Sequence, residues 1–335
     1  MSDENKNMNE EELARQLDAK EQGINSNVYG NQTANTEADA IEEVINTKGL
    51  GRVDMSNFGP EIPEKSDNIL GWHDVNLQDL PSMGKFYPAG LKLQIRSAKA
   101  AEIRHFSTMD ENNFLDMEEK LNSIVESCCK LESATKRLSY KDLLEEDRIV
   151  LLLKVRDLTF PEPENKIILK GRTEESKTPV DIELSTRYLV ANEIPEEIEK
   201  YYSDRERTYV INTRSAGTVR MHPPTIGVMQ EITKYLKDRQ EKGVEFDKAF
   251  VQILPYIISD WRTLNLKKIF ELEIEYKGWD EKKFMVIYRL AERMKIGVQT
   301  TLEKEVDGEV AKAPLDFPGG IKSLFIISDL AGELL

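Results

Sequence analysis

The chain changes from a mostly polar sequence to a periodic one near residue 70. Over residues 1–66 apolar positions are sparse, and Asn, Asp, Glu, Gln and Thr are abundant. Such a composition cannot bury enough apolar area to offset the conformational entropy that folding removes. We therefore predict that residues 1–66 form a disordered acidic tail.

Two stretches of this tail, NEEELARQLDA and EADAIEEVINT, have helical spacing. The sequence EADAIEEVINT places Ile41, Val44 and Ile45 on one face of a helix. The stretch is either a fraying helix within a disordered tail or a docking segment that folds on a partner. These three residues are therefore candidate interface residues.

Residues 67–200 predict a first unit of helices with a β-hairpin. The stretch LKLQIRSAKAAEIRHFS alternates up to Ile95 and then takes helical spacing, so a strand should lead into a helix. The stretch DMEEKLNSIVESCCKLE has an apolar stripe from Leu121 to Leu131, which is typical of an amphipathic helix. A core helix should follow Ser139, a candidate N-cap, and NKIILKG…TPVDIELS should form a hairpin.

Residues 201–335 predict the same order of elements. TVRMHPPTIGVMQEITKYLKD predicts a strand and a helix, and FDKAFVQILPYIISDW predicts a second helix. Asn265 should cap a long apolar-faced helix, and a second hairpin should have its tip at Asp307 and Gly308. We therefore predict an α+β fold of two similar tandem units, each with helices plus a β-hairpin or small antiparallel sheet. If the units arose by duplication, they should superpose over residues 78–190 and 207–317.

The stretch LPSMGKFYP, residues 80–88, predicts a rigid turn at the start of the first unit. Proline fixes its own φ and lacks a backbone donor, whereas glycine tolerates positive φ. We expect Gly84 to have positive φ, and Phe86 and Tyr87 to pack on the helices of the first unit. The predicted structural turn consists of Leu80, Pro81, Gly84, Phe86, Tyr87 and Pro88.

Charge and composition narrow the classes of partner. The formal net charge is −15, so the average surface repels nucleic acid and anionic membranes, and we expect neither as a partner. The polar N-terminus is unlike a signal peptide, and no window reaches the ~18 apolar residues of a membrane helix. Cys128 and Cys129 are adjacent and cannot easily pair with each other, so we expect buried thiols in a reducing compartment. The sequence therefore predicts a soluble cytosolic protein.

The sequence has little that predicts catalysis. It has no phosphate-binding, dinucleotide-binding, zinc-protease or nucleophile-elbow motif, and its three histidines lack ligand partners at metal spacing. A strongly apolar predicted helix carries Asp147, Arg148, Lys154, Arg156 and Asp157. These residues form either an ion-pair network that locks the helix to the hairpin or part of a catalytic site. We favour the network, and predict no enzyme activity, catalytic residue, metal, cofactor or small-molecule substrate.

The segment SLFIISDLAGELL near the end of the sequence is strongly apolar. Leu324, Phe325 and Ile327 fall within four positions of one another. Such a segment is either packed into the core of the second unit or buried in a partner. These residues are the second set of candidate interface residues.

The turn and the segments after it resemble a known family. LPSMGKFYPAG, followed by LQIRSAKAAEIRHFS and LSYKDLLEEDRIVLLLKVRDLTF, is similar to the baseplate hub proteins of T-even-type contractile-tailed bacteriophages. The resemblance covers residues 72–190 well and the second unit more loosely. Arg156 matches a late arginine of that family. The residues that match its turn are Leu80, Pro81, Ser82, Gly84, Tyr87 and Pro88.

The resemblance implies a non-enzymatic structural or assembly protein of the tail baseplate hub. Its partners would be other hub or tail proteins, met in the host cytoplasm during assembly and in the virion baseplate if the protein is retained. The predicted hairpins lack the paired cysteines that we expect of relatives, so a metal-stapled hairpin is not carried over. Two alternatives stay open. One is an acidic cytosolic adaptor or assembly chaperone that binds through its N-terminal tail and C-terminal segment. The other is an enzyme whose fold has no short motif.

Overall fold

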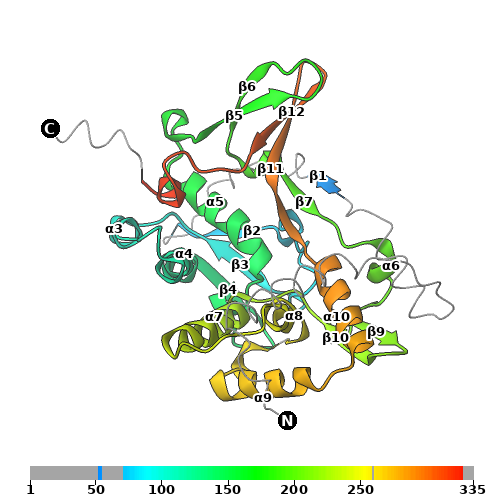
Figure 1. Ribbon diagram of the computed structural model, residues 1–335. Coiled ribbons are helices and arrows are strands. Elements are labelled where there is room, and N and C mark those ends of the chain that lie inside the picture. Colours follow the sequence, from blue (N-terminus) through cyan, green and yellow to red (C-terminus); the bar gives the residue numbers. More distant parts are fainter. Residues whose placement is uncertain (1–51, 55–70, 259, 327–335) are drawn as a thin grey trace, which may run out of the picture.

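The computed structural model describes residues 52–54, 71–258 and 260–326 (Figure 1). The fold is α+β, as the sequence predicts, and the described residues form eight α-helices and three antiparallel sheets. Within the predicted tail only residues 52–54 are described, and they form a strand, which departs from the predicted disorder. The rest of the tail, with the predicted helical face of Ile41, Val44 and Ile45, lies outside the described residues, and its disorder stays a prediction. Among the described helices, none has the length and apolar character that crossing a bilayer would need.

The first sheet has three strands and begins the first half of the chain, residues 67–200. Its order is β2-β3-β4, and Leu93 pairs with Val75 on one side and with Leu131 on the other. The strands are β2 (His73–Val75), β3 (Lys92–Ile95) and β4 (Cys129–Glu132). The helices of this half are α3 (Ala100–Ser107), α4 (Phe114–Cys128), α5 (Arg148–Thr159) and α6 (Glu196–Glu199).

Two helix boundaries in this half differ from the prediction. Helix α4 ends at Cys128, because the chain then enters β4 beside β3, so Leu131 is a strand residue. Ser139 caps only a short turn, in which the Asp142 carboxylate accepts a hydrogen bond from the Ser139 N–H at 2.8 Å, because the chain then bonds to Pro224 and Ile226 of the second half. Helix α5 therefore starts nine residues later than Ser139, at Arg148. The 3-10 turns of this half are η2 (Leu77–Asp79), η3 (Tyr140–Asp142), η4 (Glu145–Asp147), η5 (Pro163–Asn165) and η6 (Thr186–Tyr188).

The second half, residues 201–335, begins with another three-stranded sheet in the order β10-β9-β8. Asn265 caps α9 as predicted, accepting a hydrogen bond from the Lys268 N–H at 2.9 Å. The single long helix expected after it is instead two helices, because Asp280 caps a new helix by accepting from the Lys283 N–H at 2.8 Å. The elements are β8 (Tyr202–Ser203), β9 (Thr208–Thr213), β10 (Gly217–Met221), α7 (Ile226–Glu241), α8 (Lys248–Ile257), η7 (Trp261–Thr263), α9 (Leu266–Lys277), α10 (Glu281–Arg293) and η8 (Ile321–Leu324).

The third sheet has six strands, in the order β1-β7-β11-β12-β5-β6. Both predicted hairpins are confirmed, and they lie side by side in this sheet because β12 pairs with β5 (Figure 1). Residues 52–54, inside the predicted disordered tail, form a short strand that covers the edge of β7. The strands are β1 (Arg52–Asp54), β5 (Ile168–Thr173), β6 (Pro179–Glu183), β7 (Leu189–Asn192), β11 (Gly297–Val306) and β12 (Glu309–Pro314).

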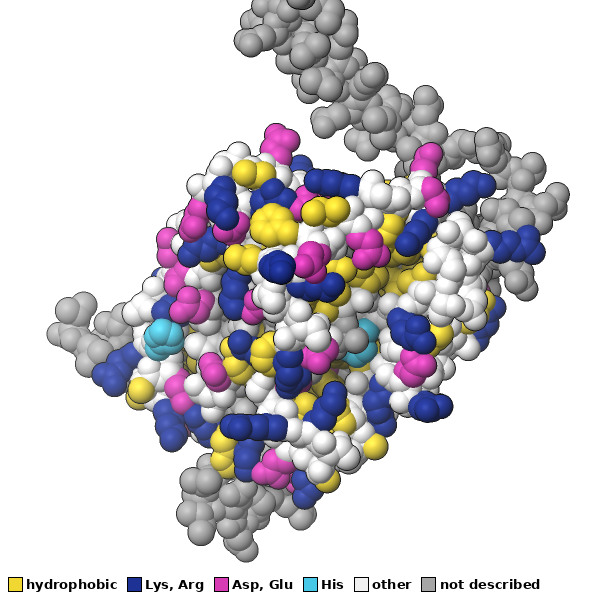
Figure 2. Space-filling view, turned by 90° about the horizontal axis from the view of Figure 1, so that it is seen from below, with side chains coloured by type: hydrophobic (Ala, Val, Ile, Leu, Met, Phe, Trp, Pro, Cys, Tyr) yellow, Lys and Arg dark blue, Asp and Glu magenta, His cyan; other side chains and the backbone are white. Residues whose placement is uncertain are grey.

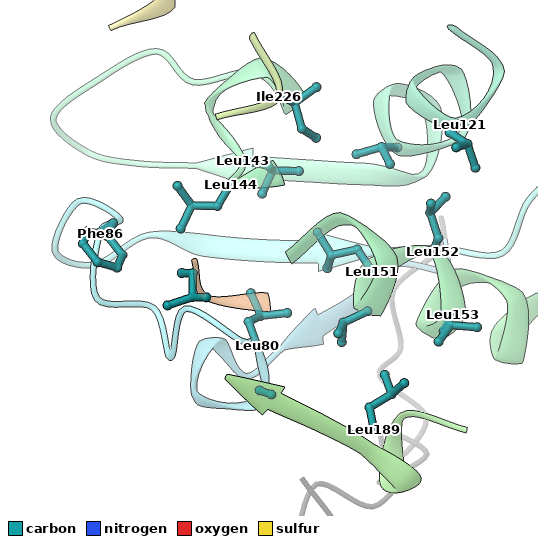
Figure 3. Packing of buried hydrophobic residues seen from close by; sticks show 14 of the residues in the cluster. Leu80, Phe86, Leu121, Leu143, Leu144, Leu151, Leu152, Leu153, Leu189 and Ile226 are labelled. Atoms are coloured by element: carbon teal, nitrogen blue, oxygen red, sulfur yellow. The ribbon is translucent and has the colours of Figure 1, made fainter. Parts of the chain in front are cut away.

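The two halves share one hydrophobic core (Figure 3). Leu144 and Leu151 of the first half and Ile226 of the second half are fully buried in the same cluster. Each half has a strand pair, helices and a hairpin in the same order. The third strand of the small sheet differs: it is β4, which pairs with β3, in the first half, and β8, which pairs with β9, in the second half. The duplication stays a prediction, whereas the two halves do not have separate cores. A smaller cluster packs α7, α8 and α9 together, at the bottom of Figure 1.

Candidate functional site

The turn at residues 80–88 has the conformation that its sequence predicts. Gly84 has a φ of +71°, and a Cβ added to it would lie 2.8 Å from the Cβ of Leu77. Leu80, Phe86 and Tyr87 are buried. Position 84 therefore needs glycine for its backbone conformation and for the close approach of Leu77.

The turn binds a carboxylate at the end of η4. Asp147 is fully buried and accepts hydrogen bonds from the Ser82 N–H at 2.9 Å, the Ser82 hydroxyl at 2.7 Å and the Tyr87 hydroxyl at 2.6 Å. The Tyr87 oxygen in turn accepts from the Leu144 N–H at 3.0 Å. Burial raises the pKa of Asp147 to about 6, and the hydrogen bonds from Tyr87 and Ser82 oppose that rise. Asp147 is thus an ionised, hydrogen-bonded group at neutral pH.

The other side of the turn contacts the second half of the chain. The Phe86 ring lies 5.6 Å from the Tyr202 ring, 5.8 Å from the Tyr209 ring and 5.2 Å from the His222 ring, measured between centroids. Phe86 therefore packs against aromatic rings of the second half, a contact that the prediction did not include. The sequence could not show this contact because the two segments are far apart along the chain.

Polar groups of the second half hold the backbone of the same turn. The Tyr202 hydroxyl donates to the Lys85 carbonyl, and Arg207 donates to the Tyr87 carbonyl. Lys85 forms an ion pair with Glu199, which also accepts a hydrogen bond from Tyr209 at 2.7 Å. The turn is therefore the joint between the two halves, held by Asp147 on one side and by the β8–β9 region on the other.

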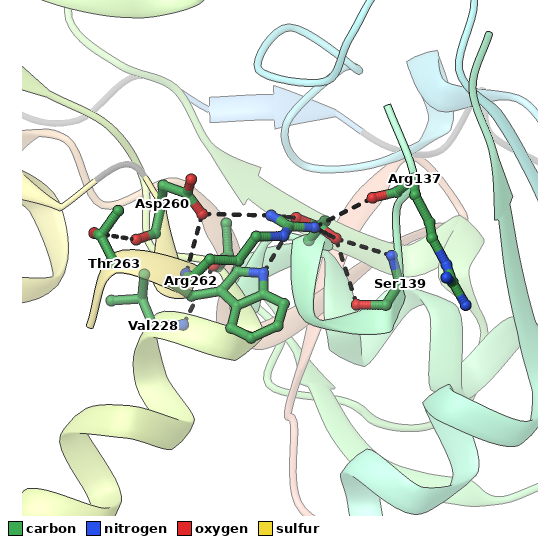
Figure 4. A network of polar contacts seen from close by, with 9 residues as sticks. Arg137, Ser139, Val228, Asp260, Arg262 and Thr263 are labelled. Carbon is green, nitrogen blue, oxygen red and sulfur yellow. Dashed lines mark hydrogen bonds and ion pairs between the residues drawn. The ribbon is translucent and has the colours of Figure 1, made fainter. Parts of the chain in front are cut away.

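A second joint involves Asp142 (Figure 4). Arg262 donates to both carboxylate oxygens of Asp142, at 2.7 and 2.8 Å, and the Trp261 indole N–H donates to the same group at 3.2 Å. A Cβ at Gly227 would lie 2.4 Å from the Trp261 ring, so glycine lets α7 approach η7 closely. Arg262 also reaches the Arg137 carbonyl at 3.3 Å. These contacts attach η7 of the second half to η3 and to the loop before it.

Of the charged residues predicted to lock α5 to the hairpin, Asp157 does so through an ion pair. Lys166 lies 3.4 Å from Asp157 of α5 and 3.5 Å from Glu183 of β6, and so connects the helix to the hairpin. Arg156 is buried and donates to the Asn165 carbonyl. Asp147 is not part of this network, since its hydrogen bonds go to the turn.

Two further carboxylates beside Asp147 line a cavity between the halves. The cavity has a volume of about 290 Å³ and is bounded by α4, η4 and α5 of the first half and by β11 and η8 of the second. Gly297 has a φ of +118°, and a Cβ there would lie 3.2 Å from Cγ of Glu146, so glycine lets β11 pass close to η4. The lining residues are Leu121, Glu145, Glu146, Arg148, Ile149, Leu152, Ile296, Gly297, Val298 and Ile321.

The charged groups of this cavity are unevenly paired. Arg148 pairs with Glu118 and with Glu145, each at 2.6 Å, and donates to Asn122 at 2.9 Å. Glu145 and Glu146 each have an Oε2 atom that is shielded from solvent and has no hydrogen-bond partner. Burial raises the pKa of both carboxyl groups. Sequence reasoning missed this site, although three successive acidic residues before an apolar helix were a signal for it.

The apolar C-terminal segment packs in the core. Leu324 is fully buried, and Phe325 is only 1% exposed, with its ring centroid 5.1 Å from that of Phe106 in α3. Of the two alternatives the structure shows core packing, in the core that both halves share. Leu324 and Phe325 are therefore not surface residues, and Ile327 lies outside the described residues.

The thiols and acidic groups offer no further site. Cys128 and Cys129 are buried and free, as predicted, and burial raises the pKa of Cys128 to about 12, so it stays a thiol. Within the described part of the chain, no group of three or more His, Cys, Asp and Glu residues is arranged to hold a metal. In comparisons with known proteins, no family model, no curated protein and no solved structure matches this chain.

Proposed function

We propose that this protein is a non-enzymatic structural or assembly protein of a phage tail baseplate hub. The observation that carries the proposal is the position of the turn at residues 80–88. Two of the residues that resemble the hub family, Ser82 and Tyr87, bind Asp147. The carbonyl groups of Lys85 and Tyr87 accept hydrogen bonds from Tyr202 and Arg207 of the second half. The residues that carry the resemblance therefore lie in the contact that holds the two halves together. Proteins of the hub family with the same architecture would need the same residues there.

The surface of α9 supports a role in docking. Ile274 is 73% exposed, and Leu266 on the same helix is also exposed. Figure 2 looks from below at the end of the molecule where α9 lies in Figure 1, and shows apolar side chains interspersed with basic and acidic ones. Apolar anchors within a charged surround are typical of a protein–protein interface. Hub and tail proteins are the partners that the resemblance suggests.

The test is co-purification with tail proteins. The tagged full-length chain, expressed during infection by a T-even-type phage, should co-purify with baseplate hub or tail proteins. Mass spectrometry of purified particles then separates a retained subunit from a transient assembly factor. Failure to bind hub and tail proteins, together with absence from particles, would overturn the proposal.

A pair of surface variants tests the docking face. Ile274→Ser should weaken the co-purification without lowering the thermal midpoint, because the side chain is mostly exposed. Val310→Ser, at an exposed position of β12, is the matched control and should bind like the parent. Equal binding by both variants would remove α9 from the docking surface.

The alternative adaptor role is less well supported. It assigns partner binding to the C-terminal segment, but Leu324 and Phe325 are packed inside the chain. An adaptor would have to expose other residues, such as those of the N-terminal tail.

A further inference from the structure

The cavity between the halves has two chemically distinct parts. Most of its wall is aliphatic, and Glu145 and Glu146 supply carboxyl groups at one side. Apolar cavities of about 150 Å³ in other proteins hold a ligand the size of benzene, so about 290 Å³ is ample for a long side chain. The aliphatic part consists of Leu121, Ile149, Leu152, Ile296, Val298 and Ile321.

The two carboxyl groups of the cavity have fewer hydrogen-bond donors around them than buried carboxyl groups usually have. The Oε2 atoms of Glu145 and Glu146 are buried without a hydrogen-bond partner, although most buried polar atoms in proteins have one. The nearest cation, Arg148, already contacts Glu118, Glu145 and Asn122. The terminal torsion of a glutamate is soft, so a small rotation can turn either oxygen toward the cavity.

We propose that this cavity binds an arginine side chain of a partner protein, with its aliphatic stem against the apolar wall and its guanidinium between Glu145 and Glu146. A guanidinium has five N–H donors in a planar fork, which suits two adjacent carboxylates better than a compact ammonium does. The stem would cover the aliphatic wall, as long cationic side chains do elsewhere. The inference deepens the proposed docking function, because it names the chemistry of one contact.

The proposal makes binding depend on pH. Burial raises the pKa of the Glu146 carboxyl group well above its ordinary value, whereas a bound cation favours the ionised form. Binding therefore releases a proton, and affinity rises with pH until the free carboxyl group is ionised. No charged residue of β11 or η8 lines the cavity. The ionisable groups whose charge acts with that of Glu146 are Glu145, Asp147 and Arg148 beside it, Glu118 through Arg148, Tyr87 of the turn, and Tyr256 of α8.

The experiment titrates the full-length protein with butylguanidinium, a probe that has the same stem and head group as arginine. The methyl NMR signals of Ile149, Ile296 and Ile321 report on the cavity, and that of Ile274 on α9 is a remote reference. Butylurea has the same shape without the charge, and butylammonium has the charge without the fork. We expect the guanidinium to bind about tenfold more tightly than the urea at pH 8, as one charge-assisted contact would give. The ammonium should fall between them.

Two variants locate the site. Glu146→Gln keeps the shape and removes the charge, so it should weaken butylguanidinium binding about tenfold and abolish its pH dependence. Glu175→Gln removes the same charge at an exposed position in the β5–β6 turn and should bind like the parent. Unchanged isoleucine methyl signals in the free variants would show that each is folded.

Several outcomes would overturn the inference. The inference is wrong if butylguanidinium shifts no cavity methyl signal, if it binds no better than butylurea or butylammonium, or if it binds Glu146→Gln as tightly as the parent. Because the probe needs no partner protein, these results are independent of the co-purification test. A cavity that binds the probe in a protein that binds no tail protein would refute the proposed function and leave the cation site standing.

Discussion

Replacing Tyr87 with Phe tests the joint at the turn. The change removes one hydroxyl, which donates to Asp147 at 2.6 Å and accepts from the Leu144 N–H at 3.0 Å. A hydrogen bond to a charged group contributes about 1.5–3 kcal/mol, and a buried N–H left unpaired costs about 1–3 kcal/mol. Because one hydroxyl serves both partners and the site can relax, we expect Tyr87→Phe to lower the free energy of unfolding by about 2–4 kcal/mol.

The measurement is denaturant unfolding followed by circular dichroism, for the parent, Tyr87→Phe, Asp147→Asn and the double variant. The two side chains touch, so the double variant should lose less than the sum of the single losses, with a coupling of about 0.5–3 kcal/mol. The effect of Tyr87→Phe should also be larger at pH 8 than at pH 5, where Asp147 gains a proton and needs its donors less.

The control is Tyr201→Phe, a half-buried tyrosine of the same region. It should change the free energy of unfolding by less than about 0.5 kcal/mol. Our account of the joint is wrong if Tyr87→Phe unfolds like the parent, or if the losses at Tyr87 and Asp147 simply add.

Three further predictions use stability as the readout. Gly84→Ala should lower the free energy of unfolding by about 1–3 kcal/mol more than Gly90→Ala, because both glycines have a φ of +71° but only Gly84 has a close neighbour; equal losses would argue against the steric part. Phe325→Ala should cost about 3–5 kcal/mol in chemical unfolding, and Ile168→Ala, at an exposed position, less than about 1 kcal/mol; a stable Phe325→Ala chain would contradict core packing. Asp147 has an ordinary pKa of 3.8 and a folded pKa of about 6, so only the unfolded chain loses this proton between about pH 4 and 6. The free energy of unfolding should therefore fall by about 3 kcal/mol across that window as pH rises, and Asp147→Asn should remove this contribution from the measured pH profile.

Elements determined by neighbouring residues were predictable from the sequence. The β11–β12 hairpin has its tip at Asp307 and Gly308, both with positive φ, as the local sequence indicates. Asn265 caps α9 for an equally local reason, since its side chain reaches an N–H three residues on. The positive φ of Gly84 follows from the turn sequence in the same way.

Features that depend on distant segments were not predictable. The chain stays extended before α5 because the Ile226 N–H donates to the Leu143 carbonyl and the Glu145 N–H donates to the Pro224 carbonyl. The helical pattern of residues 140–147 does not indicate these hydrogen-bond partners, which lie about 80 residues later in the chain. The cavity was missed for the same reason, since Glu146 meets Gly297 only in the folded chain.

The shared sheet has a consequence for how the protein folds during synthesis. Strand β5 pairs with β6 on one side but finds its other neighbour only in β12, and Phe106 of α3 is covered by Phe325. The first half therefore keeps an open strand edge and exposed core residues until β12 and Phe325 have left the ribosome. Contacts so distant in sequence are slow to form, and the waiting state is open to aggregation. The chain is thus expected to fold as one unit after synthesis, and residues 67–200 expressed alone should not form a stable domain.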